Sequence, residues 1–276
     1  MKYVLLLLLW VSMPFTAAAQ SFDHGHSTWA ALLKKHVLLI DGGKSSQVRY
    51  AGFAQDRGDL KAYLATLSKV TPAEFSSWSK AQQMAFLINA YNAFTVEKIL
   101  TRHPDIKSIW DFGKVFGNPF KDRFFTLLGR EFSLDMIEHD TLRQPGAYNE
   151  PRVHFAVNCA SVGCPMLREE PYVAARLDAQ LEEQTRRFLA DRSRNRYNAA
   201  DNALEVSEIF KWFGKDWSSG YRGFDGRSEA MLSLAQFFAK YADLLADAPA
   251  HRQTIMERRA PIRHLDYDWT LNDVRR

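Results

Sequence analysis

The segment between residues 79 and 104 predicts a helix that is apolar on nearly every side. Ser79 and Gln82 form a capping box, in which an N-cap hydroxyl is followed three residues later by an amide side chain. Pro104 lies beyond the helix end, since proline cannot continue a helix. A helix with this pattern belongs in the interior of a protein. We therefore expect the rest of the chain to pack around it.

Patterns on both sides of this segment predict further helices and a few strands. Helices are expected over residues 29–40, about 60–67, from Pro72 behind the N-cap Thr71, over 134–142, about 176–192 and, capped by Ser228, from 229 to about 245. Strands are expected at 124–128, 131–133, 153–157 and 204–206, with a hairpin turn at Gly129 and Arg130. The predicted fold class is α+β, a mostly helical single domain around a small antiparallel β-sheet.

The first 19 residues have the pattern of a secretory signal peptide. Lys2 precedes an apolar run over residues 4–11, and small residues follow as far as Ala19. We expect cleavage after Ala19, which leaves residues 20–276 as a single globular domain in the periplasm or outside the cell. The apolar run is too short to anchor the chain. No other stretch reaches the length of a transmembrane helix, so no membrane span is expected.

The net charge and the absence of common motifs exclude several classes of binding partner and cofactor. The 276 residues carry a formal net charge of +4, which is weak evidence for any partner. A basic cluster follows helical spacing and predicts a solvated helix face: Arg186, Arg187, Arg192, Arg194 and Arg196. No nucleic-acid partner is therefore expected. The sequence has no H-E-x-x-H, phosphate-binding loop, G-x-S-x-G or G-x-G-x-x-G motif, and we expect neither a metal nor a cofactor.

Both cysteines of the chain lie in one short segment that begins with His154. On a strand, His154 and Asn158 project from the same face. Pro165 suits the first position of a helix with Cys164 as its N-cap, where the helix dipole lowers the pKa of a thiol. This arrangement predicts a Cys-His hydrolase or acyl/amide transferase with Cys164 as nucleophile and His154 as base. Asn158 or Glu138 would orient the histidine, and Cys159 would be a supporting or resolving thiol.

Two other interpretations of the cysteines stay open. In an oxidising compartment Cys159 and Cys164 form a structural disulfide if the chain between them turns sharply enough. The protein would then be a non-catalytic periplasmic binding or scaffold domain. A zinc site that combines these thiols with His154 and His139 matches no established ligand spacing.

Other polar and aromatic residues are candidates for a substrate pocket. Asn89, Tyr91 and Asn92 lie on the central helix, where buried amides more often bind backbone groups than substrate. Tyr267 and Trp269, near the C-terminus, either cover a pocket or dock the tail. The substrate class left open by the sequence is a small molecule, a peptide or a component of the cell envelope.

Several of these blocks together resemble one family, the domain of unknown function 547 family. The blocks span residues 81 to 272 and are Asn89-Ala90-Tyr91-Asn92, His154-Phe155, Asn158-Cys159, Cys164-Pro165, the run from Ser207 to Trp212, Asp216, Tyr267-Asp268-Trp269 and Asn272. The resemblance implies an exported bacterial member of a widespread family with no settled activity. It also implies that bacterial members usually keep both cysteines, whereas plant members often lack the second cysteine and sometimes the histidine.

Overall fold

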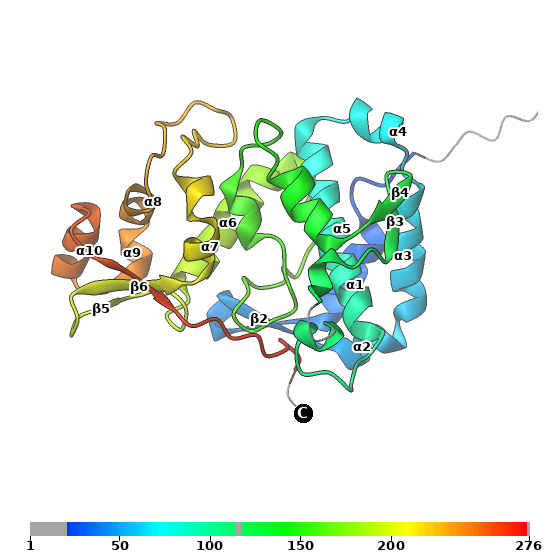
Figure 1. Ribbon diagram of the computed structural model, residues 1–276, viewed down its shortest axis with the longest axis horizontal. Helices are drawn as coiled ribbons and strands as arrows, with labels where there is room; N and C mark the ends of the chain where they lie inside the picture. The colour runs from blue at the N-terminus through cyan, green and yellow to red at the C-terminus, as the bar shows by residue number, and fades with distance from the viewer. Residues whose placement is uncertain (1–20, 114–116, 275–276) are drawn as a thin grey trace, which may run out of the picture.

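The structure is a computed structural model and describes residues 21–113 and 117–274 (Figure 1). The predicted signal peptide, residues 1–19, lies outside the described residues. Helices dominate and the strands form small sheets, so the expected α+β class is confirmed. Within the described ranges no helix combines the length and the apolar character needed to cross a membrane.

The helices fall into α-helices and shorter helical turns. The α-helices are α1 (Ser27–His36), α2 (Tyr50–Gln55), α3 (Arg57–Lys69), α4 (Pro72–Ser77), α5 (Lys80–Leu100), α6 (Leu177–Ala190), α7 (Ile209–Trp217), α8 (Leu234–Lys240), α9 (Ala242–Leu245) and α10 (Pro249–Met256). The 3-10 helices are η1 (Asp41–Gly43), η2 (Ile109–Phe112), η3 (Pro119–Lys121), η5 (Pro151–Phe155) and η6 (Ala174–Arg176), and η4 (Met136–Leu142) is a π-helix.

The strands form three separate small sheets. Two are antiparallel pairs, β1 (Val37–Ile40) with β2 (Ser45–Val48), and β3 (Phe125–Leu127) with β4 (Arg130–Phe132). The second pair is the predicted hairpin. The third sheet has the order β5 (Arg196–Asn198), β6 (Ala203–Ser207) and β7 (Ile262–Leu265), with β5 antiparallel and β7 parallel to β6. Strand β7 brings the C-terminal segment back across the molecule (Figure 1).

Helix α5 is the central helix that the sequence predicts. The capping box of Ser79 and Gln82 is present, and most residues from Met84 to Leu100 are buried. Helices α1, α2 and α3 lie around it on the right-hand side of Figure 1. Together they build the first hydrophobic cluster, which includes Trp29, Phe53 and Phe86.

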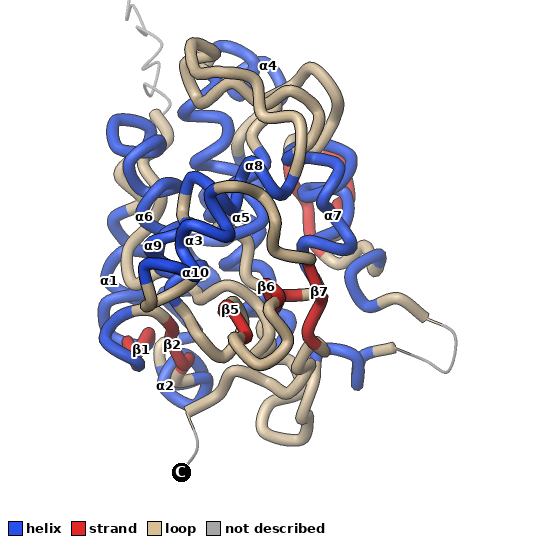
Figure 2. Tube along the Cα trace, turned by 90° about the vertical axis from the view of Figure 1, so that its left-hand side faces the viewer, coloured by secondary structure: helices blue, strands red, loops and turns tan. Residues whose placement is uncertain are grey.

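A second hydrophobic cluster belongs to the C-terminal elements. It joins residues of α6 to α10 and β6, among them Phe188, Phe210 and Trp217. Figure 2 shows β5, β6 and α10 in front, with α3 and α5 behind them. Helix η5 contacts both clusters, because Val153 packs in the first and Phe155 in the second. The segment that carries the cysteines therefore lies where the two clusters meet.

Four local predictions are wrong. The helix expected over residues 29–40 ends at His36, and residues 37–40 form strand β1, which pairs with β2. Residues 153–157 are not a strand: the side chain of Glu150 accepts a hydrogen bond from the N–H of Arg152, and Pro151 starts the 3-10 helix η5. No helix begins at Pro165, so Cys164 is not an N-cap. The helix expected from Ser228 begins later, behind the N-cap Ser233, and is divided into α8 and α9 at Tyr241. For η5 and α8 a local N-cap, Glu150 or Ser233, overrides the apolar pattern.

Candidate functional site

A pocket of about 310 Å³ lies at the junction of the two clusters. Seven residues proposed from the sequence line it, from elements that are distant in the chain: Tyr91, Glu138, His154, Cys159, Cys164, Tyr267 and Trp269. Their convergence makes this pocket the candidate functional site. Among the described residues, no group of three or more His, Cys, Asp or Glu side chains is arranged to hold a metal ion.

The asparagines of α5 hold the segment that carries the cysteines. The side chain of Asn92 donates to the carbonyl oxygen of Ala156 at 2.9 Å and accepts from the N–H of Asn158 at 2.8 Å. Asn89 makes the same two kinds of bond with the backbone of Tyr172, at 2.7 and 3.0 Å. Both amides are buried, and neither lines the pocket. Their role is to fix the loop on the helix.

Asn158 closes the loop between the two cysteines. Its side chain donates to the carbonyl oxygen of Pro165 at 2.8 Å and accepts from the N–H of Ala160 at 3.0 Å. Gly163 donates to the carbonyl oxygen of Asp268 at 2.8 Å, and a Cβ at this position would lie 2.9 Å from the Asp268 nitrogen. Asn158 is therefore a structural residue of the loop and does not contact His154 as an orienting group.

One arginine of the basic cluster also holds this loop, against the expectation of a solvated face. Arg194 is buried, pairs with Asp191 and donates to the carbonyl oxygens of Val162 and Cys164. Its position after the end of α6 turns the side chain inward. Helical spacing does not reveal this, because the arginine is no longer on the helix.

Cys159 lies at the pocket and is partly exposed. The hydroxyl groups of Ser161 and Tyr267 lie 3.0 and 3.1 Å from its sulfur. Burial raises the pKa of the Cys159 thiol, but hydrogen bonds from Cys164, Ser161 and Tyr267 outweigh burial, and the net pKa is lowered. The environment thus favours the thiolate of Cys159.

Cys164 has the opposite environment. It is only 5% exposed, and its sulfur accepts a hydrogen bond from the N–H of Cys159 at 3.0 Å. The thiol itself faces the carbonyl oxygen of Val157 at 3.7 Å. Burial and the neighbouring Cys159 sulfur raise the pKa of Cys164 well above its ordinary value. The two sulfurs are unbridged in this structure.

His154 lies between two carboxylates. Its Nε2 is 2.8 Å from Oδ2 of Asp216, and its Nδ1 is 3.6 Å from Oε1 of Glu138. The ring stacks on Phe213 with a centroid distance of 4.2 Å. Within the described part of the chain, no hydrogen bond joins His154 to either sulfur. The structure brings His154 and the cysteines to one pocket but does not join them as a dyad.

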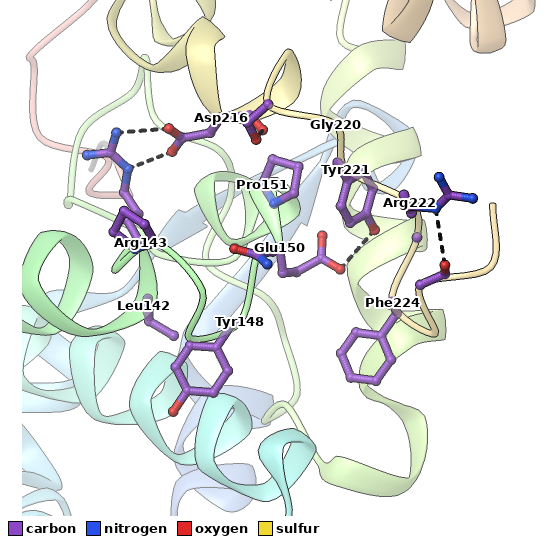
Figure 3. A pocket seen from close by; sticks show the side chains of 15 residues that line it. Leu142, Arg143, Tyr148, Glu150, Pro151, Asp216, Gly220, Tyr221, Arg222 and Phe224 are labelled. Atoms are coloured by element: carbon purple, nitrogen blue, oxygen red, sulfur yellow. Dashed lines mark hydrogen bonds and ion pairs between the residues drawn. The ribbon is translucent and has the colours of Figure 1, made fainter. Parts of the chain in front are cut away.

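Arg143 completes the chain of charges behind His154. It binds both oxygens of Asp216, at 2.7 and 3.2 Å, as seen from a neighbouring pocket in Figure 3. Burial raises the pKa of Asp216, but hydrogen bonds from His154 and Arg143 outweigh burial and hold it well below its ordinary value. The pKa of Glu138 is also lowered, because its bond and attraction to His154 exceed the effect of burial. Both side chains are carboxylates at neutral pH.

Sequence reasoning missed several lining and supporting residues. Arg143 directly follows η4 and carries no motif of its own, although it lies only four residues after His139. Ser161 lies inside the cysteine segment and was not singled out. Trp110, Phe120 and Asp135 also line the pocket, and only the folded chain brings them there.

The C-terminal segment is docked and lines the pocket as well. Leu271 donates to the carbonyl oxygen of Lys107 at 2.7 Å, and Val162 donates to that of Thr270 at 2.8 Å. These bonds hold Tyr267 and Trp269 beside the cysteines. The two interpretations of this segment, a docked tail and a pocket wall, therefore apply together.

The fold and the site define an α+β domain with a dithiol pocket between two hydrophobic clusters. Residues 75–189 match the model of the family described as "Protein of unknown function, DUF547", so this part of the chain is similar to that family. The matched range includes α5, both cysteines and His154, whereas Asp216, Tyr267 and Trp269 lie beyond it. Comparison with curated proteins and with solved structures gave no significant match.

Replacing Asn92 should destabilise the protein markedly. Asn92→Ala leaves the carbonyl oxygen of Ala156 and the N–H of Asn158 without partners in a buried place, which costs about 2–4 kcal/mol of the free energy of unfolding. Urea denaturation measures this loss. Gln253→Ala, which removes an exposed amide on α10, is the control and should change stability by less than about 0.5 kcal/mol. A loss for Asn92→Ala no larger than that of the control would contradict the assigned role.

Alkylation should distinguish the two thiols. Because its pKa is lowered, Cys159 should react with iodoacetamide at a rate that levels off below the ordinary cysteine pKa of about 8.5. Cys164 should react far more slowly at every pH, since it is buried and its pKa is raised. Peptide mass spectrometry of the reduced, desalted protein gives both rates.

Tyr267→Phe and Ser161→Ala each remove a hydroxyl from the Cys159 sulfur and should move its rate profile to higher pH. Tyr197→Phe removes a hydroxyl outside the pocket and serves as the control. Faster labelling of Cys164 than of Cys159 would overturn this description of the site.

Proposed function

We propose that the protein is a thiol-dependent enzyme, a hydrolase or an acyl/amide transferase, with Cys159 as its nucleophile. One observation carries the proposal: the Cys159 sulfur lies in a pocket within 3.1 Å of two hydroxyl groups that stabilise its thiolate. A stabilised, accessible thiolate is the form of cysteine that attacks carbonyl carbon. The pocket volume suits a small acyl group or the end of a longer substrate.

The roles differ from those of the Cys-His dyad expected from the sequence. Cys164 is too buried to receive substrate and supports Cys159 by hydrogen bonding. His154 faces carboxylates at both nitrogens, so it acts as a positioning residue for Glu138 and Asp216. The hydroxyls of Ser161 and Tyr267 stabilise the thiolate in place of a base at the sulfur.

The proposed reaction has two steps that balance. The Cys159 sulfur forms a bond to the carbonyl carbon, the bond from that carbon to the leaving oxygen, nitrogen or sulfur breaks, and the thiol proton ends on the leaving group. Water or an acceptor amine or alcohol then attacks the thioester. The carbon–sulfur bond breaks, and the proton of the attacking group returns to the Cys159 thiol.

A non-catalytic binding or scaffold domain is the second candidate. It is favoured by the closeness of the two cysteines, since the Cys164 sulfur lies 3.0 Å from the Cys159 nitrogen. A Cys159–Cys164 disulfide would remove the nucleophile and pin the loop. Oxidation would lower the intact mass of the isolated protein by two hydrogens.

An activated ester tests the two candidates directly. With 4-nitrophenyl acetate, the reduced protein should release a burst of nitrophenolate equal to the protein concentration and carry one acetyl group on Cys159. Cys159→Ala should lower the burst rate by about 100-fold or more, whereas Cys164→Ala should keep the adduct. Absorbance and peptide mass spectrometry give the readouts.

An undiminished burst of nitrophenolate from Cys159→Ala would contradict the enzyme proposal. Protein purified without reductant that carries the disulfide and regains no reactive thiol on reduction would do the same, and would favour the binding domain.

We also propose that the protein is exported, on the strength of the signal-peptide pattern in residues 1–19. Expressed from its full sequence in a bacterium, it should appear in the periplasmic fraction or the medium, with Gln20 as its first residue. N-terminal sequencing checks the cleavage, and a cytoplasmic enzyme marks leakage. Protein that stays in the cytoplasm with its first residues intact would contradict export.

A further inference from the structure

One side of the site pocket is a continuous wall of aromatic rings. Trp269 contacts Tyr267, Trp110 and Trp212 at centroid distances of 4.4, 5.3 and 5.8 Å, and Phe120 lies beside Trp110 at 5.8 Å. Trp110 and Trp212 are 39% and 40% exposed. The wall therefore presents indole surface to whatever enters the pocket.

The pocket also carries excess negative charge. Asp135 and Glu138 line it, and no Lys or Arg is among the lining side chains within residues 21–113 and 117–274. Both nitrogens of His154 face carboxylates, and Nδ1 of His139 accepts a hydrogen bond from Arg143. Arg143 itself is engaged by Asp216 outside the pocket. The thiolate of Cys159 would add a further negative charge.

An aromatic wall and carboxylates in one pocket both favour a cation. The faces of indole and phenol rings attract a cation, most strongly where water is excluded. The carboxylates repel an anionic ligand.

We propose that the pocket recognises a small organic ammonium group, held against the aromatic wall near Asp135 and Glu138. Its location beside Cys159 rests on the proposed function and extends it. The substrate would be an ester, thioester or amide whose acyl carbonyl reaches the Cys159 sulfur while its ammonium group occupies the pocket. The positive charge of such a substrate would also stabilise the thiolate that attacks it.

Calorimetric titration with choline and with 3,3-dimethylbutan-1-ol separates charge from shape, because the alcohol is the neutral analogue of the same size. The mature protein and Cys159→Ala are both titrated. We expect choline to bind both proteins at least about tenfold more tightly than the alcohol. Trp212→Leu and Glu138→Gln should each weaken choline binding about tenfold, while Trp78→Phe, which alters an aromatic residue outside the pocket, should not. Thermal melting confirms that each variant is folded.

Equal affinity for choline and the alcohol, no binding of choline, or full affinity in folded Trp212→Leu and Glu138→Gln proteins would overturn the inference.

A second experiment measures the chemical step separately from binding. The rate of acetylation by acetylthiocholine is compared with that by S-(3,3-dimethylbutyl) thioacetate, and the cationic thioester should react about tenfold faster at low concentration. If choline binds selectively but no adduct forms on Cys159, the proposed cation site stands and the proposed enzyme activity is refuted. An adduct formed without preference for the cation would refute the cation site alone.

Discussion

The arrangement of the site depends on two hydrogen bonds between Asn92 and the backbone at Ala156 and Asn158. Helix α5 is buried on all sides, so a polar residue in its interior needs a partner from another part of the chain. Residues 156–165, which carry the cysteines, form neither a helix nor a named strand, so their backbone N–H and C=O groups need hydrogen-bond partners as well. The Asn92 side chain and the backbone of the cysteine segment therefore satisfy each other's hydrogen bonds. These bonds fix the position of the loop along α5.

The sequence was informative wherever a structure is determined by neighbouring residues. The capping box of Ser79 and Gln82, the N-cap Thr71 and the hairpin at Gly129 are all present. It failed where two local signals compete. At residues 151–155 the β-branched and aromatic side chains favour a strand, but the cap from Glu150 and the fixed φ of Pro151 favour a turn, and packing against two clusters selects the turn.

The sequence named part of the set of residues that line the candidate site, but not their contacts. The sequence named both cysteines, His154, Glu138, Tyr267 and Trp269, and all of them line one pocket. It could not tell which thiol is exposed, because that depends on how residues 158–165 turn. Asn158 and Arg194 set that turn, and their partners are distant in the chain or on its backbone. The distinction between Cys159 and Cys164 is therefore a property of tertiary structure.

The pocket is built from two parts of the chain with different tasks. The range that matches the family supplies the two thiols, the carboxylate of Glu138, and Asn89 and Asn92, which hold the loop on α5. The segment beyond it supplies Tyr267, Trp212 and Trp269, which touch the sulfur or form the aromatic wall. The matched range adds Trp110 and Phe120 to that wall, so the aromatic surface beside the thiols combines residues from both parts of the chain. Tyr267 links the two parts, since its hydroxyl reaches Cys159 while its ring packs against Trp269.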